Sequence, residues 1–197
     1  MIIQTHAPLP ERRTWDYYPT PQALCESALN NVLPSNFVPT VVHDPGAGTG
    51  RWGDAVKMKY AESFLVGIEP HFEPPENNNY NRWNKQTYQD FLEKSTSKAD
   101  LIVGNPPYKF AMEFVTGALG SVNNGGYVVY LLRLVFLAGK KRAAGLWKTC
   151  PPETVWICNA RPSFFENNKT NATDYAVYVW HKGGRKKPPQ IRWLIWR

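Results

Sequence analysis

The sequence predicts an α/β fold in which a mostly parallel β-sheet is flanked by helices on both faces. Short apolar runs alternate with stretches of helical character along the chain, and this alternation is typical of a parallel sheet. The apolar runs are nearly continuous, as expected for strands that are buried on both faces. A length of 197 residues suits one domain with a full core.

The first half of the chain contains two predicted strands, and each ends at residues of functional interest. The first strand runs into a glycine-rich loop, and the second ends in an acidic residue. In order, we expect a strand at Val41–Asp44, a helix at Arg51–Ser63, a strand at Phe64–Glu69, a loop at His71–Asn81 and a short helix or turn at Tyr88–Lys94.

The second half continues the alternation and ends with two strands around a polar loop. We expect a strand at Asp100–Gly104, a helix at Lys109–Ser121, a strand at Gly126–Leu134, a strand at Val155–Asn159, a loop at Arg161–Thr173 and a strand at Tyr175–Trp180. Ligands of parallel sheets bind beyond the carboxyl ends of the strands. Gly46, Glu69 and Asn105 each lie at or just after such an end, so we expect them at one edge of the fold.

The net charge of +7 favours an acidic partner such as nucleic acid. Two segments are basic and contain no acidic residue, one from Lys182 to Arg197 and the other from Arg133 to Lys148. A solvated basic face would show the same pattern.

No feature indicates a membrane, secretion or a metal. The longest apolar run, Tyr127–Ala138, contains a charge and is too short to span a bilayer. No signal peptide is evident. Cys25, Cys150 and Cys158 are widely spaced and form no zinc pattern, so we expect reduced cysteines, no bound metal and a cytoplasmic protein.

The glycine-rich loop Asp44-Pro45-Gly46-Ala47-Gly48-Thr49-Gly50 lets a ligand approach the backbone closely. Its spacing matches neither the G-x-G-x-x-G dinucleotide fingerprint nor a phosphate-binding loop. Glu69 ends the next strand, where a carboxylate can accept hydrogen bonds from both hydroxyls of a ribose. Together, loop and acid indicate a nucleoside-type cofactor.

Asn105-Pro106-Pro107-Tyr108 is the most specific pattern in the chain. The lone pair of an exocyclic amine on an aromatic ring is delocalised into the ring, so two acceptors on its N–H bonds make it a better nucleophile. The Asn105 side-chain oxygen and the Pro106 carbonyl supply such acceptors. Consecutive prolines make the backbone rigid, and Tyr108 offers a ring on which a base can stack.

These motifs resemble those of the amino-methyltransferases among the class I S-adenosylmethionine-dependent enzymes, most closely the small, phage-type DNA adenine-N6 methyltransferases. The resemblance covers about residues 15–181. It implies a Rossmann-like fold with a mostly parallel seven-stranded sheet whose last strand is antiparallel, S-adenosyl-L-methionine as cofactor, and DNA or RNA as partner. It divides the chain into a methyltransferase domain, residues 1–182, and a basic C-terminal tail, residues 183–197. A phage-encoded enzyme would act in the host cytoplasm.

The resemblance also assigns roles to individual residues. Asn105, Pro106, Pro107 and Tyr108 match the catalytic motif. The matches to the cofactor site are Tyr18, Thr20, Asp44, Gly46, Ala47, Gly48, Gly50, Glu69, Asp90, Phe91 and Asn105. Within that set, Asp90 corresponds to the residue that takes the cofactor's adenine amine, and Phe91 to the one that packs on its ring.

Substrate contacts are expected from Tyr108, from the late loop and from the tail. Arg161 precedes Phe164, our candidate for stacking on the displaced base, with Phe165 as the fallback and a core role for both as the alternative. Lys186 and Lys187 are expected to contact the nucleic-acid backbone. The chain lacks the large recognition domain of restriction-type enzymes, which puts strong sequence specificity in doubt.

Several alternatives share these motifs. The same Asn-Pro-Pro-Tyr sequence serves enzymes that methylate a glutamine of release factors, although those usually carry an additional N-terminal helical domain. Adenine or guanine in ribosomal RNA is a second alternative. Cytosine N4 enzymes more often have Ser where Asn105 stands. A nucleic-acid-binding module with a vestigial methyltransferase fold is the alternative outside the enzymes.

Overall fold

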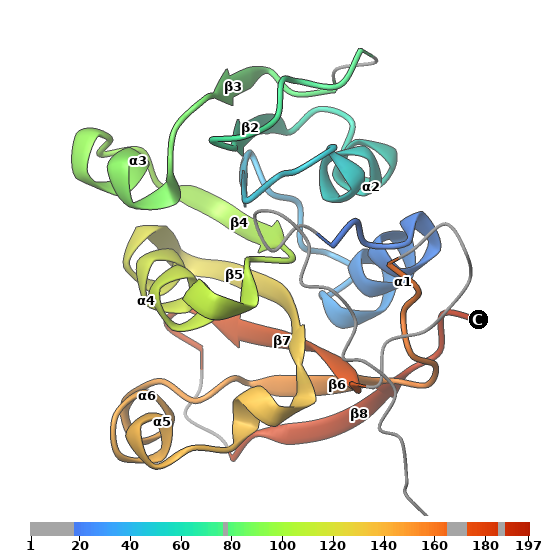
Figure 1. The fold of residues 1–197 in the computed structure, drawn as a ribbon, viewed down its shortest axis with the longest axis vertical. Helices are drawn as coiled ribbons and strands as arrows, with labels where there is room; N and C mark the ends of the chain where they lie inside the picture. The colour runs from blue at the N-terminus through green and yellow to red at the C-terminus, as the bar shows by residue number, and fades with distance from the viewer. Residues whose placement is uncertain (1–17, 77–78, 165–172, 185–187) are drawn as a thin grey trace, which may run out of the picture.

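The computed structural model describes residues 18–76, 79–164, 173–184 and 188–197. They form one twisted sheet with helices on both faces (Figure 1). The first half of the chain contributes α1 (Gln22–Val32), β1 (Val41–Pro45), α2 (Arg51–Lys59), β2 (Phe64–Ile68), β3 (Arg82–Asn84), α3 (Tyr88–Lys94) and β4 (Ala99–Gly104). The expected loop at residues 71–81 precedes the short strand β3, which the sequence did not reveal.

The second half of the chain completes the sheet. A 3-10 turn, Tyr108–Phe110, leads into α4 (Ala111–Ser121) and β5 (Val122–Arg133), and a second 3-10 turn, Leu134–Leu137, leads into the short helices α5 and α6. The remaining elements are α5 (Lys140–Ala144), α6 (Leu146–Thr149), β6 (Thr154–Cys158), β7 (Tyr175–His181) and β8 (Gln190–Leu194).

The described strands form an eight-stranded sheet in the order β3-β2-β1-β4-β5-β7-β6-β8. β7 pairs antiparallel with β5 and β6, and every other pairing is parallel. The prediction of a mostly parallel sheet with an antiparallel strand at Tyr175–Trp180 is confirmed. The expected number of seven strands was wrong.

A second strand that the sequence did not reveal, β8, comes from the segment that we interpreted as a basic tail. Gln190–Leu194 pairs in parallel with Thr154–Cys158, and Leu194 is buried in the core. The basic residues around this segment obscured its alternation of polar and apolar residues. The C-terminal segment therefore contributes to the domain itself.

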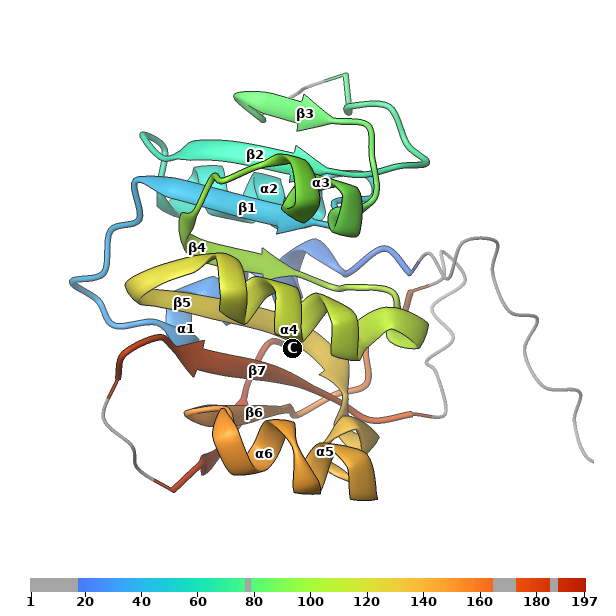
Figure 2. The same cartoon turned by 90° about the vertical axis from the view of Figure 1, so that its left-hand side faces the viewer.

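Helices cover both faces of the sheet. Figure 2 shows α3, α4, α5 and α6 in front of the sheet and α1 and α2 behind it. Two large apolar clusters fill these layers, one under α1 and α2 and one under α4 and α6. Of the described helices, none combines the length and hydropathy that a bilayer-spanning segment needs.

The strand order reverses next to β1, which lies between β2 and β4. The crevice at such a reversal is the usual ligand site of an open α/β sheet. The glycine loop after β1, Glu69 after β2 and Asn105 after β4 all lie at this point.

Candidate active site

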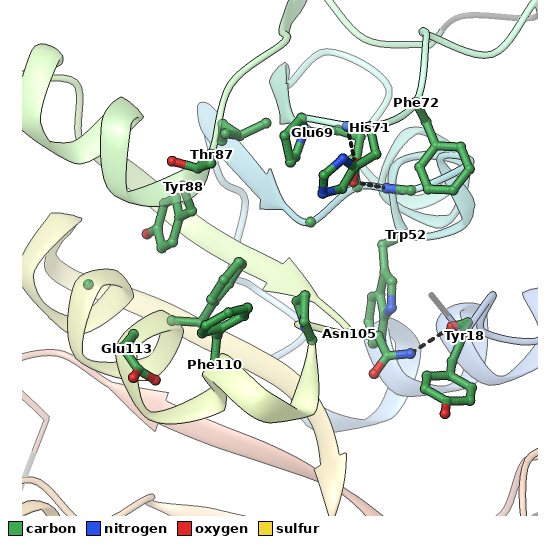
Figure 3. Close-up of a pocket in the computed structure, with 18 of the residues that line it drawn as sticks. Tyr18, Trp52, Glu69, His71, Phe72, Thr87, Tyr88, Asn105, Phe110 and Glu113 are labelled. Carbon is green, nitrogen blue, oxygen red and sulfur yellow. Dashed lines mark hydrogen bonds between the residues drawn. The ribbon is translucent and has the colours of Figure 1, made fainter. Parts of the chain in front are cut away.

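A cavity of about 970 Å³ opens at the carboxyl ends of β1, β2 and β4. Its volume lies in the range of about 300–1,000 Å³ that is common for small-molecule sites. The described residues on its walls that sequence reasoning had singled out are Tyr18, Thr20, Gly46, Ala47, Gly48, Glu69, Asn105 and Pro107. Figure 3 shows that α3 and α4 complete the wall opposite the glycine loop.

The glycine loop lines the cavity with its backbone. Gly46 and Gly48 have φ angles of 74° and 56°, in the left-handed region that favours glycine. The Gly46 N–H donates to the Ile68 carbonyl at 2.8 Å, and a side chain at Gly46 would lie 3.5 Å from Pro107. Gly50 precedes α2 with a φ of 86° and lies outside the cavity wall, so its role is to turn the chain into the helix.

Glu69 connects the loop to the floor of the cavity. One carboxylate oxygen accepts from the Gly48 N–H at 2.9 Å and the other from the His71 N–H at 2.8 Å (Figure 3). The side chain is buried yet borders the cavity. Because a carboxylate offers about four lone-pair sites, Glu69 retains capacity to accept hydrogen bonds from a ligand.

Asp44 lies beneath the loop rather than on the cavity wall. It is fully buried, and one of its oxygens accepts from the Tyr80 hydroxyl at 2.6 Å. Burial raises the pKa of Asp44 to about 7, and the Tyr80 hydrogen bond opposes this rise. The structure therefore does not support the expected direct contact of Asp44 with a cofactor.

Asp90 and Phe91 also lie away from the cavity wall. Phe91 is buried against Val66 and Ile68 and lies edge-on to His43. Asp90 accepts from the Thr87 hydroxyl at 2.6 Å at the start of α3. Neither residue lines the cavity in this conformation, so the expected contact of this pair with the cofactor's adenine stays a prediction. Thr87, Tyr88, Gln89 and Leu92 line the cavity instead.

Asn105 presents an acceptor without a partner. Its Nδ2 donates to the Tyr18 carbonyl at 2.9 Å (Figure 3). Its Oδ1 is buried and accepts no hydrogen bond from any described residue. A buried acceptor without a partner is unfavourable and therefore requires an explanation. Pro106 is buried beside it, and Pro107 lies on the cavity wall.

Tyr108 belongs to an aromatic cluster and not to an open stacking face. Tyr18 stacks on its ring at 5.5 Å between centroids, and the Arg133 guanidinium carbon lies 4.6 Å from the ring centroid. Burial raises the pKa of Tyr108 well above its usual value, and the Arg133 charge opposes this rise. A base can stack on Tyr108 only if one of these neighbours moves.

Phe164 is a core residue in this conformation, which was the alternative interpretation. It is 2% exposed and lies edge-on to Tyr18 and Tyr175. The rings of Tyr18, Tyr108, Phe164 and Tyr175 thus form one cluster next to Asn105. Phe165 lies outside the described residues.

The remaining candidates for substrate contact are only partly described. Arg161 donates to Asp174 at 2.7 Å, so its charge is already paired at the base of the loop. Lys186 and Lys187 lie outside the described residues.

Besides the cavity residues of α3, sequence reasoning missed Trp52, Tyr80 and Arg133. Trp52 lines the cavity immediately after the glycine loop, and its aromatic side chain at that place was the only available signal. Tyr80 supports Asp44 from a segment that reads as a loop. Arg133 appeared in the sequence only as one basic residue among several, because its contact with Tyr108 depends on the sheet.

No family model and no curated protein matches the sequence. Solved structures do match. A protein from Listeria monocytogenes, assigned as a class I S-adenosylmethionine-dependent methyltransferase, is 12% identical with a TM-score of 0.64, over 93% of this chain and 67% of the other. A protein from Agrobacterium tumefaciens, assigned as an O-methyltransferase, is 15% identical with a TM-score of 0.60, over 88% of this chain and 85% of the other.

A third similar structure belongs to a larger protein. A chain from Vibrio vulnificus, assigned as the modification subunit of a type I restriction enzyme, is 15% identical with a TM-score of 0.63. The match covers 88% of this chain and 45% of that subunit, so our chain spans less than half of its length. Taken together, these likenesses show that the chain has the Rossmann-like fold of class I methyltransferases.

Proposed function

We propose that this chain is an S-adenosylmethionine-dependent methyltransferase that transfers a methyl group to N6 of adenine in DNA. The observation that carries the proposal is the buried Asn105 Oδ1, which has no partner among the described residues and lies at the edge of the cavity. A positioned oxygen that can accept a hydrogen bond from an N–H group is what the binding of an exocyclic amine requires.

The cavity fits the proposed cofactor. The Glu69 carboxylate supplies acceptors for ribose hydroxyls, and the glycine loop lets the ligand approach the backbone without a side chain between them. Phe110, Met112 and Phe114 give the α4 side an apolar surface for a flat ring. When bound, the cofactor supplies a methyl group that is already activated on a sulfonium.

The protein's contribution is then to orient the amine. Asn105 Oδ1 and the Pro106 carbonyl would accept hydrogen bonds from the two N–H groups of N6. The lone pair of N6 would then be directed at the methyl group. The bound cofactor would supply the methyl group and its sulfur would retain the electron pair of the methyl–sulfur bond, while the methylated amine would release one proton to solvent. Because N6 is paired within a duplex, the adenine must first be displaced from the helix.

Net charge and neighbouring structures support DNA as the substrate. The chain carries a charge of +7, and Lys140, Lys141 and Lys148 are exposed on α5 and α6. The similar Vibrio vulnificus structure is a subunit assigned to a restriction enzyme.

The test is transfer of labelled methyl from S-adenosylmethionine to unmethylated DNA, ribosomal RNA and release factor, in separate reactions. We expect N6-methyladenine in digested DNA, identified by mass, and none with the Asn105→Ala variant. Label in RNA or protein instead would contradict the proposed substrate. A protein that neither binds the cofactor nor transfers label would be a binding module.

A further inference from the structure

Arg133 is the last residue of β5, at the same edge of the sheet as the catalytic motif. β5 pairs with β4, which leads into Asn105, and Gly104 lies opposite Tyr130 in that pairing. The Arg133 guanidinium carbon lies 4.6 Å from the centroid of the Tyr108 ring. Arg133 is therefore the cation that the fold brings to the residue on which the target base is expected to stack.

The Arg133 side chain has no hydrogen-bonding or acidic partner in the part of the chain that the structure describes. Its Nε is buried and donates to no described residue. The described ion pairs use other cations, such as Arg161 with Asp174. In the sequence, no Asp or Glu occurs between Glu113 and Glu153. A half-buried guanidinium whose Nε has no partner among the described residues is suited to an anion.

The position of the cation indicates which anion. In a nucleotide, a single sugar joins the base to the phosphate. When the base stacks on Tyr108, its phosphate therefore lies close to the Tyr108 ring, separated from the base only by that sugar. Planar guanidinium groups bind phosphate oxygens with two parallel hydrogen bonds. We propose that Arg133 binds the phosphate of the nucleotide whose base is methylated, a role that rests on the proposed function.

The test measures DNA binding as a function of salt. A fluorescent duplex that contains adenine is titrated with the full chain at several salt concentrations, and the same is done with Arg133→Gln and Arg133→Lys. Loss of one phosphate contact should reduce the slope of log affinity against log salt by about 1 and weaken binding about tenfold at low salt. The lysine variant keeps the charge and should retain most of the slope.

Arg82→Gln is the matched control. Arg82 is exposed at the start of β3, on the far edge strand of the sheet, and its substitution removes the same formal charge. It should leave the slope unchanged. S-adenosylmethionine binding is measured for every variant, because a correctly folded Arg133→Gln protein should bind the cofactor as the wild type does.

An unchanged salt slope in Arg133→Gln, with reduced thermal stability, would overturn the proposal and make Arg133 a support for the Tyr108 ring. Failure of the proposed function looks different: it appears in the wild type, which would bind the cofactor and transfer no methyl group to DNA.

Discussion

The Asn105 side chain donates from Nδ2 to the backbone carbonyl of Tyr18 at 2.9 Å, a contact between residues 87 positions apart. This hydrogen bond fixes the orientation of the amide, because a carbonyl can only accept. The oxygen of Asn105 is therefore left as the acceptor without a partner among the described residues. A backbone carbonyl in the N-terminal segment thus determines which atom of the Asn105 amide is left without a partner.

Replacing Asn105 with Ala should abolish turnover while cofactor binding persists. We expect kcat to fall by about 100-fold or more, the size of effect seen when one positioned hydrogen-bonding group is removed from an active site. The dissociation constant of S-adenosylmethionine, measured by calorimetry, should change by less than about threefold. This corresponds to a change of less than about 0.7 kcal/mol in the free energy of binding.

Asn123→Ala is the control for this substitution, because that amide donates to Asp100 away from the cavity. It should retain wild-type turnover. Loss of cofactor binding and turnover together in Asn105→Ala would instead make Asn105 a structural residue.

Replacing Glu69 with Gln should weaken cofactor binding. The two carboxylate oxygens accept from Gly48 and His71, and an amide would place N–H groups against one of these donors. We expect the dissociation constant to rise about 10- to 100-fold, which corresponds to about 1.4–2.8 kcal/mol. Glu62→Gln, at an exposed turn before β2, should have no effect, and an equal loss in both variants would assign the effect to net charge.

Two glycines in helices should respond in opposite directions to alanine. A side-chain carbon at Gly53 would lie 2.3 Å from the Tyr80 ring, whereas one at Gly120 meets nothing within 4 Å. Gly53→Ala should destabilise the fold by about 1–3 kcal/mol through overpacking, and Gly120→Ala should stabilise it by about 0.5–1 kcal/mol. Denaturant unfolding measures both, and a stable Gly53→Ala variant would contradict the observed position of Tyr80.

Asp44→Asn should change how stability depends on pH. Burial raises the pKa of Asp44 to about 7, so between about pH 4 and pH 7 the folded state binds more protons than the unfolded state. The contribution of this group to stability is present at low pH and is lost as the pH rises through 7. An asparagine does not titrate and escapes this loss.

From pH 5 to pH 8, the free energy of unfolding of Asp44→Asn should therefore gain roughly 2.5 kcal/mol relative to that of the wild type. Burial also lowers the pKa of His43 to about 4, but His43 titrates in both proteins and cancels in the difference. A constant difference across this range would show that Asp44 ionises normally in the folded protein.

Local patterns were sufficient for six of the eight described strands, for the glycine loop and for the placement of Glu69 and Asn105 at one edge. A buried parallel strand can be recognised in the sequence by its apolar run. The direction of the chain then defines the carboxyl end of the strand, where ligands bind. The same reasoning failed at Gln190–Leu194, where the neighbouring basic residues led us to interpret a strand as a tail.

The sequence by itself determined the fold class and the placement of the glycine loop, Glu69 and Asn105 at one edge of the sheet, because these follow from short stretches of chain. Only the tertiary structure decided that Tyr18 orients Asn105, that Tyr80 supports Asp44 and that Arg133 lies over Tyr108. These contacts join distant segments, and their partners are chosen by strand order and packing rather than by any local pattern.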